Sequence, residues 1–240
     1  QGPFADWLGT TPTPVSPTQI SADANDTRSI AVGDMNNDGY PDLIVGNGSS
    51  QINRWYPWPF SAGQVGGNIT NTAADTRAIE VADFNQDGKL DVITGEDSSN
   101  GHYYRRSNSG FYSGVIVGPV ANIRKVRVAD LNNDGAPDVV FANAGQNTFV
   151  LNNKNSSQAF PGTNGVIGSE TENTTDIRLL DYDNDGDIDV ISGSSNTSNK
   201  LYLNQSGAIP FTSSTPGLAV SANISDTRAI AVGTMRDNTT

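Results

Sequence analysis

The chain repeats one acidic loop pattern four times, and this pattern constrains the fold more than any other feature. Each copy reads D-x-[DN]-x-D-G-x-x-D, and the copies begin at Asp34, Asp83, Asp130 and Asp181. The starts are 49, 47 and 51 residues apart, a spacing typical of a repeat protein. The pattern brings carboxylate and amide oxygens to one turn, and Ca²⁺ takes about six to eight such oxygens. The sequence therefore predicts a repeat protein whose loops bind Ca²⁺.

Short apolar segments flank each loop. Residues 30–33 and 126–129 alternate before their loops, which is typical of a strand with one buried face, and residues 43–46 form an apolar run after theirs. A third apolar or aromatic segment follows, and then a Phe recurs at positions 60, 111, 160 and 211, where we expect it to open an outer strand. Four short strands in about 50 residues are typical of a β-propeller blade. We predict an all-β propeller; a β-solenoid, whose coils take shorter repeats, is the alternative.

The repeats divide the chain into one propeller domain or propeller fragment over residues 1–240. Residues 1–26 match an outer strand of a preceding blade, and residues 27–75, 76–123, 124–174 and 175–226 are four full repeats. Residues 227–240 are a partial fifth repeat, in which residues 230–233 repeat the alternating pattern of a first strand and Thr234 replaces the leading Asp. A four-bladed ring, a fragment of a larger ring and completion by another chain all stay open. Because the chain begins with Gln1, we interpret it as a processed chain or an excised piece.

The run IAVGDMNNDGYPDLIVGN at 30–47 resembles the FG-GAP or VCBS repeat, and the resemblance covers nearly the whole chain. That repeat builds the propellers of integrin α subunits and of many bacterial secreted proteins. The resemblance implies that the loop between the first two strands of a blade holds Ca²⁺. The ligands would be the side chains at loop positions 1, 3, 5 and 9 and the backbone carbonyl at position 7. In chain order these residues are Asp34, Asn36, Asp38, Tyr40 and Asp42; Asp83, Asn85, Asp87, Lys89 and Asp91; Asp130, Asn132, Asp134, Ala136 and Asp138; and Asp181, Asp183, Asp185, Asp187 and Asp189.

Other interpretations of the loops fit less well. An EF-hand loop begins in the same way, but it needs a Glu at position 12, where this chain has Val45, Thr94, Phe141 and Ser192. The Asp at position 9 must then supply the closing carboxylate. A metal-free turn rich in Asp and Asn is the alternative for one loop alone, and four complete loops favour metal. Mg²⁺ is disfavoured because it resists dehydration. We expect the four Ca²⁺ ions to be structural.

Charge and composition limit the classes of partner and the cellular location that we expect for this protein. The net charge is −12, and thirteen of the 26 acidic residues stand at side-chain ligand positions, so four bound Ca²⁺ ions would leave −4. What remains gives no signature of nucleic-acid or anionic-membrane binding. The lack of cysteine excludes disulfides and thiolate chemistry, and no apolar run is long enough for a membrane span. Since calcium is plentiful outside cells, we expect a secreted or cell-surface protein.

Residues that point to catalysis are few. His102 is the only histidine and lies in a polar stretch, which favours an exposed residue and a protein that is not an enzyme. Aromatic side chains beside polar donors are candidates for ligand binding; blade packing is the favoured alternative for them. These candidates are Arg54, Trp55, Tyr56, Trp58, Tyr103 and Tyr104.

We therefore expect an extracellular, calcium-stabilised module for adhesion to, or recognition of, a glycan or protein ligand. Two alternatives stay open. One is a structural subunit of an extracellular filament or surface layer, completed by strand exchange with neighbouring copies of itself. The other is an accessory propeller of a polysaccharide-degrading enzyme.

Overall fold

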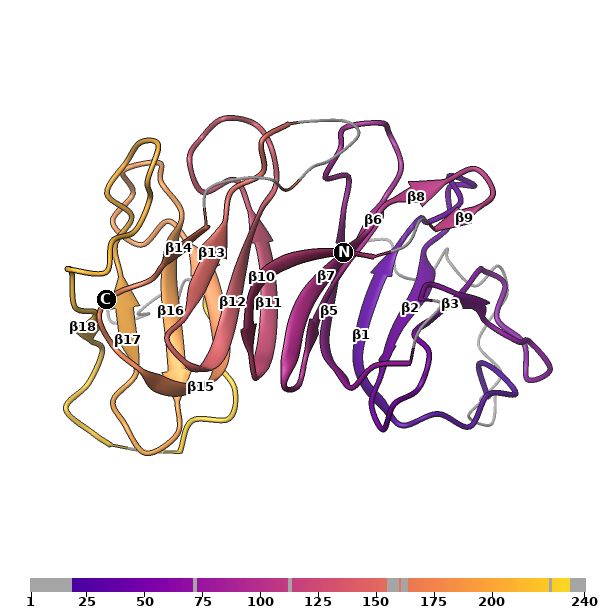
Figure 1. The fold of residues 1–240 in the computed structure, drawn as a ribbon, viewed down its shortest axis with the longest axis horizontal. Coiled ribbons are helices and arrows are strands. Elements are labelled where there is room, and N and C mark those ends of the chain that lie inside the picture. The colour runs from indigo at the N-terminus through magenta and orange to yellow at the C-terminus, as the bar shows by residue number, and fades with distance from the viewer. Residues whose placement is uncertain are drawn as a thin grey trace, which may run out of the picture.

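The computed structural model describes residues 19–70, 73–111, 114–154, 160, 164–224 and 226–233, without the side chains of 119–121. Within these residues every regular element is a β-strand. Four antiparallel units of four strands each follow one another in chain order along a curved row (Figure 1). Each unit is one blade, and the third and fourth units are joined in one eight-stranded sheet. The all-β, propeller-type architecture expected from the repeats is therefore present. Among the described residues, no helix has the length and apolar character needed to span a membrane.

Each blade takes its strands in chain order from the inner to the outer edge. Blade one holds β1 (Thr27–Gly33), β2 (Asp42–Asn47), β3 (Arg54–Tyr56) and β4 (Gly67–Asn68); blade two holds β5 (Thr76–Ala82), β6 (Asp91–Glu96), β7 (Ser99–Tyr104) and β10 (Val115–Ala121). Blade three holds β11 (Ile123–Ala129), β12 (Asp138–Gly145), β13 (Thr148–Val150) and β14 (Asn164–Val166); blade four holds β15 (Glu172–Leu180), β16 (Asp189–Ser194), β17 (Lys200–Tyr202) and β18 (Leu218–Ala219). A small hairpin of β8 (Arg106–Ser107) and β9 (Gly110–Phe111) leaves blade two between β7 and β10.

The hydrophobic cores lie between neighbouring blades. One core joins Ile44 of blade one to Val92 of blade two, a second joins Ile93 to Phe141, and a third joins Val140 to Val190. This arrangement follows from the second strands, which are apolar on both faces and are buried on both. In all four blades the first strand carries a register shift near its start, a shared β-bulge that repeats with the sequence. Blades three and four are also joined directly, because β12 pairs with β15 at two positions.

The recurring Phe does not open the outer strand, so that prediction is wrong. Each outer strand begins four or more residues after its Phe. In blades three and four the Phe side chain packs instead against the preceding blade: Phe160 lies 5.3 Å from Phe84 and 5.4 Å from Tyr103 between ring centroids, and Phe211 lies 5.8 Å from Phe149. Burying an aromatic ring at a blade joint stabilises the array more than placing it at an exposed edge.

The two ends of the row differ from its middle. Ile30 is 59% exposed, whereas the equivalent Ile79, Val126 and Ile177 are at most 3% exposed, because a preceding blade covers each of them. At the other end, the partial fifth repeat was expected to begin with a strand at 230–233. The described residues 226–233 form no strand, and the described residues include no second strand of that repeat to pair with them. The segment is held on blade four instead, where the Ile230 amide donates to Asp176 Oδ2 at 2.8 Å. Of the outer strand expected within residues 1–26, residues 1–18 lie outside the described residues, and the described residues 19–26 form no strand.

Candidate metal centres

The four acidic loops occupy the same place in every blade, between its first and second strands. In the first loop, Asp34 Oδ1 accepts the Asp38 amide at 3.0 Å and Asp34 Oδ2 accepts the Gly39 amide at 2.8 Å. Loops two and three repeat both contacts. The residue at position 4 has φ between 56° and 61° in all four loops, and the Gly at position 6 has φ between 83° and 93°. Two left-handed residues in three positions bend the chain around one centre, and glycine tolerates such a φ best.

The Asp at position 9 is the buried end of each loop. Asp42, Asp91 and Asp138 are fully buried and Asp189 is 1% exposed. Each accepts the backbone amide that follows the third strand, as in the 2.7 Å bond from Asn152 to Asp138. Burial, reinforced by the neighbouring loop carboxylates, raises the pKa of Asp91 and of Asp138 to about 6. A carboxylate in such a place is costly to ionise unless a cation lies beside it.

The oxygens of loop four fit the Ca²⁺ that the repeat implies. In loop four, ligand oxygens of Asp181, Asp183 and Asp189 all lie within 4.8 Å of one another, and Asp181 Oδ1 is buried without a hydrogen-bond partner. Of the thirteen Asp side chains at ligand positions, only Asp134 is within ion-pair distance of a cationic side chain in the described part of the chain. Clustered oxygen donors of this kind, without basic partners, suit a hard divalent cation.

Each of the first three loops is tied to the next blade by two side-chain hydrogen bonds. From position 4, Asn37 donates to Gly88 O at 2.9 Å and Gln86 donates to Gly135 O at 2.8 Å, while Asn133 reaches the Asp187 carboxylate. In the opposite direction, a side chain after the third strand donates to the carbonyl at position 2 of the preceding loop. The pairs are Arg106 to Met35, Asn152 to Phe84 and Asn204 to Leu131. The loops are therefore part of the blade joints.

The sequence pattern did not lead us to predict the side-chain donors that follow the third strands. Arg106, Asn152 and Asn204 are equivalent to Trp58 in blade one, and these four positions are spaced by 48, 46 and 52 residues. That spacing follows the spacing of the loops and was the available signal, but the residue is Trp in blade one, Arg in blade two and Asn in blades three and four.

We expect Gln86→Gly to destabilise the protein by about 1 kcal/mol, because it removes the hydrogen bond to Gly135 O. Glycine retains the left-handed backbone that Gln86 adopts at φ 56°. The matched control is Asn184→Gly at the same loop position, where φ is 61° and no hydrogen bond is made within the described residues. Urea unfolding in excess calcium measures both variants. Equal losses of stability would show that the joint bond contributes nothing.

The predicted ligand-binding aromatic residues pack mostly within and between blades. Tyr56, Tyr103 and Tyr104 are at most 4% exposed, and their burial assigns them to the cores. Trp55 is partly buried beneath the Arg106 guanidinium, whose Cζ lies 4.7 Å from the ring centroid. Arg54 bonds to Gly66 O and Asn68 on its own blade. Trp58 is 37% exposed and is the most accessible aromatic of the set.

His102 is not the free surface residue that its sequence context suggests. Its Nδ1 lies 3.0 Å from Oε1 of the nearly buried Glu96, and this contact raises the pKa of His102. Both side chains come from blade two, and the Thr94 hydroxyl donates to the same Glu96 oxygen at 3.4 Å. The pair is therefore part of a polar contact within the sheet of blade two.

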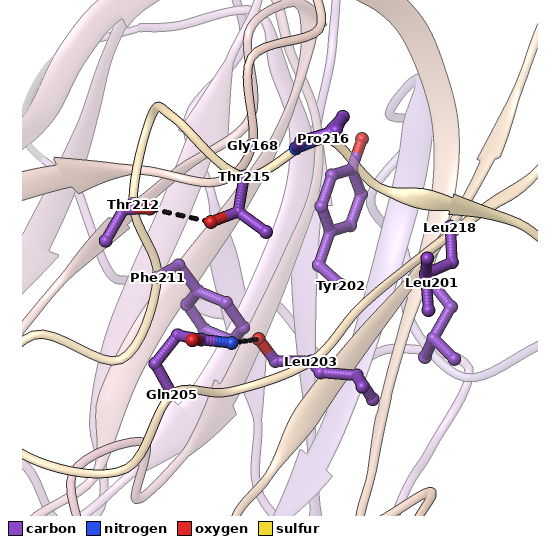
Figure 2. Close-up of a pocket in the computed structure, with 10 residues that line it drawn as sticks. All are labelled: Gly168, Leu201, Tyr202, Leu203, Gln205, Phe211, Thr212, Thr215, Pro216 and Leu218. Atoms are coloured by element: carbon purple, nitrogen blue, oxygen red, sulfur yellow. Dashed lines mark hydrogen bonds between the residues drawn. The ribbon is translucent and has the colours of Figure 1, made fainter.

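An apolar pocket of about 150 Å³ lies at the outer edge of blade four (Figure 2). Leu201, Leu218 and Phe211 supply much of its wall. The polar side chains there already have partners, since Thr212 bonds to Thr215 at 3.0 Å and Gln205 bonds to Leu203 O at 3.4 Å. The pocket therefore offers few polar groups that could orient a ligand.

Comparison with known families decides what kind of repeat this is. The FG-GAP-like repeat matches residues 83–141 and 130–192, and the FG-GAP repeat matches residues 27–65. The chain belongs to the FG-GAP repeat family. The resemblance inferred from residues 30–47 is thus confirmed. No match was found among curated proteins.

A solved structure of low sequence identity shares the fold. The crystal structure of BBS1N in complex with ARL6DN, soaked with lead, is 12% identical with a TM-score of 0.53, and the match covers 76% of this chain and 55% of that one. The V. cholerae biofilm matrix protein Bap1 is 15% identical with a TM-score of 0.44, over 74% of this chain and 29% of that one. This FG-GAP chain spans about half the length of the BBS1N chain and less than a third of the length of Bap1.

Proposed function

We propose that this FG-GAP protein is a calcium-stabilised, extracellular module for adhesion and recognition, without catalysis of its own. Its FG-GAP repeats and propeller-type sheets support a binding role in general. The finer statements, that Ca²⁺ occupies the loops, that the setting is extracellular and that the ligand is a glycan or a protein, are part of the proposal.

The observation that carries the proposal is the build of the four loops. Each one gathers several carboxylates, buries the last of them, and hydrogen-bonds across a blade joint in the first three cases. A cation in each loop would neutralise these charges and would fix neighbouring blades relative to one another. A rigid row of blades presents a surface of constant shape, which lowers the ordering cost of binding.

The test is binding measured with and without calcium. The purified chain is applied to an array of neutral and acidic glycans and to a panel of purified surface proteins, in excess Ca²⁺ and then in EDTA. We expect binding to at least one of these classes, weakened at least tenfold by EDTA and restored by added Ca²⁺. Binding to neither class, or binding that ignores calcium, would overturn the proposal.

One structural observation favours a filament subunit as a second candidate. Ile30 and Val32 are 59% and 61% exposed on β1, the face that a preceding blade covers at every other joint. Sedimentation velocity on the same samples separates the two functions. A chain that stays monomeric while it binds ligand supports recognition, whereas polymers that grow with protein concentration support the filament.

A further inference from the structure

The joint between blades one and two differs from the other joints. It contains a cavity of about 220 Å³ beside the first acidic loop, and its wall includes the side chains of Lys89 and Arg106. Both are partly buried, and neither makes an ion pair within the described residues. Two cationic side chains therefore share one cavity with no carboxylate at ion-pair distance in the described part of the chain, although Asp42 of the first loop is near enough to attract Arg106.

Arg106 is held in place by contacts that leave most of its donors free. Its Nε donates to Met35 O at 3.3 Å, and its Cζ lies 4.7 Å from the Trp55 ring and 5.1 Å from the Phe111 ring. No hydrogen bond is made by its two Nη atoms within the described part of the chain. A guanidinium fixed through one nitrogen and two aromatic faces keeps a planar pair of donors for a bidentate oxyanion.

The other joints serve as internal controls. The position of Arg106 is taken by Asn152 and Asn204 in the next two blades, and each of them makes the same hydrogen bond to the preceding loop. The position of Lys89 is taken by Ala136 and Asp187. The joint itself therefore requires only a neutral donor, and the two positive charges at the first joint are additional to that role.

The rest of the wall is polar and neutral. Asn36, Asn37, Ser107 and Asn108 contribute to it. Amide and hydroxyl groups both donate and accept hydrogen bonds, as the hydroxyl groups of a sugar do, whereas the side chain of an acidic peptide offers only acceptors. The cavity is smaller than the roughly 300–1000 Å³ that encloses a drug-sized ligand, so it suits one charged sugar unit at the surface.

We propose that this cavity is a subsite for the carboxylate or sulfate group of an acidic saccharide, bound by Arg106 and Lys89. The proposal rests on the recognition function above and names the ligand class of that function. Because the whole chain is acidic, long-range electrostatics oppose an anionic ligand, and attraction must come from this local pair of cations.

The test compares the wild-type chain with Arg106→Asn and Lys89→Ala in excess Ca²⁺. Arg106→Asn installs the residue found in blades three and four and can keep the bond to Met35 O, and Lys89→Ala copies loop three, so both variants are expected to fold. The control is Arg228→Asn, the same loss of charge at a side chain that is 85% exposed and far along the chain. The probes are oligogalacturonate, dextran sulfate, neutral dextran and an acidic peptide, with Kd measured by calorimetry and melting curves recorded for every variant.

We expect the wild type and Arg228→Asn to bind at least one acidic probe and to ignore neutral dextran. Arg106→Asn should weaken that binding about tenfold or more, and Lys89→Ala should weaken it several-fold, with unchanged melting temperatures. Equal binding by all four proteins would overturn the subsite. Binding of neutral glycans or of proteins alone would overturn the subsite while leaving the recognition function intact, and a preference for acidic peptides over both saccharides would also overturn it. Absence of all binding would overturn both.

Discussion

Removing calcium is expected to lower the melting temperature of this protein by about 20 °C or more. A ligand at about 100 times its Kd stabilises the folded state by about 2.7 kcal/mol per site, so four sites contribute on the order of 10 kcal/mol. That sum is comparable with the whole stability of a typical domain, about 5–15 kcal/mol. For a chain of this size, about 1 kcal/mol corresponds to about 2–4 °C in melting temperature. Differential scanning calorimetry in excess Ca²⁺ and in EDTA measures the change.

The same experiment separates calcium from a general effect of divalent ions. Adding Mg²⁺ to the chelated protein should recover little of the lost stability, because Mg²⁺ holds its water and prefers a tight octahedral site. Adding Ca²⁺ should recover all of it. A melting curve that EDTA leaves unchanged would mean that the loops are ordinary turns held by their own hydrogen bonds, such as the one from Gly39 to Asp34.

The fold could be predicted from the sequence because the same pattern of strands and acidic loop occurs in four successive repeats. Every copy has an alternating segment before the loop, such as residues 30–33, and an apolar run after it, such as residues 43–46. In the structure these two segments pair as the first two strands of each blade. The error over the recurring Phe has a physical origin. A single aromatic residue in a polar stretch indicates burial, but the sequence does not say whether the ring turns inward on its own sheet or toward the preceding blade.

The joints were harder to predict than the blades. A hydrogen bond such as that from Gln86 to Gly135 O links residues 49 positions apart, and the sequence around Gln86 does not predict it. The cavity beside Arg106 was equally hidden, since it depends on two side chains from blade two meeting the first loop. The prediction of a strand at 230–233 was wrong for a related reason. An alternating pattern forms a strand only where a neighbouring strand is available to complete the hydrogen bonds.

The second large effect concerns Asp138, the buried Asp of loop three. We expect Asp138→Asn to destabilise the calcium-loaded protein by about 3 kcal/mol or more. The carboxylate accepts the amides of Leu131 and Asn152 through different oxygens, at 2.9 and 2.7 Å. An Asn side chain has one acceptor oxygen, so one buried amide is left without a partner, and one of the proposed Ca²⁺ ligands is lost in addition. Thermal unfolding of both proteins in excess Ca²⁺ measures the loss.

In EDTA the loss caused by the same substitution should shrink to about 1 kcal/mol. Without a cation the wild-type carboxylate lies buried beside Asp130 and Asp134, and removing its charge offsets part of the lost hydrogen bond. The control is Asp97→Asn, which breaks the ion pair with Arg77 outside the loops and should cost the same with and without calcium. An Asp138→Asn penalty that is equal in Ca²⁺ and in EDTA would make Asp138 a structural hydrogen-bond acceptor only. A penalty that depends on calcium assigns the ion to loop three, and by the repeat to the equivalent Asp42, Asp91 and Asp189.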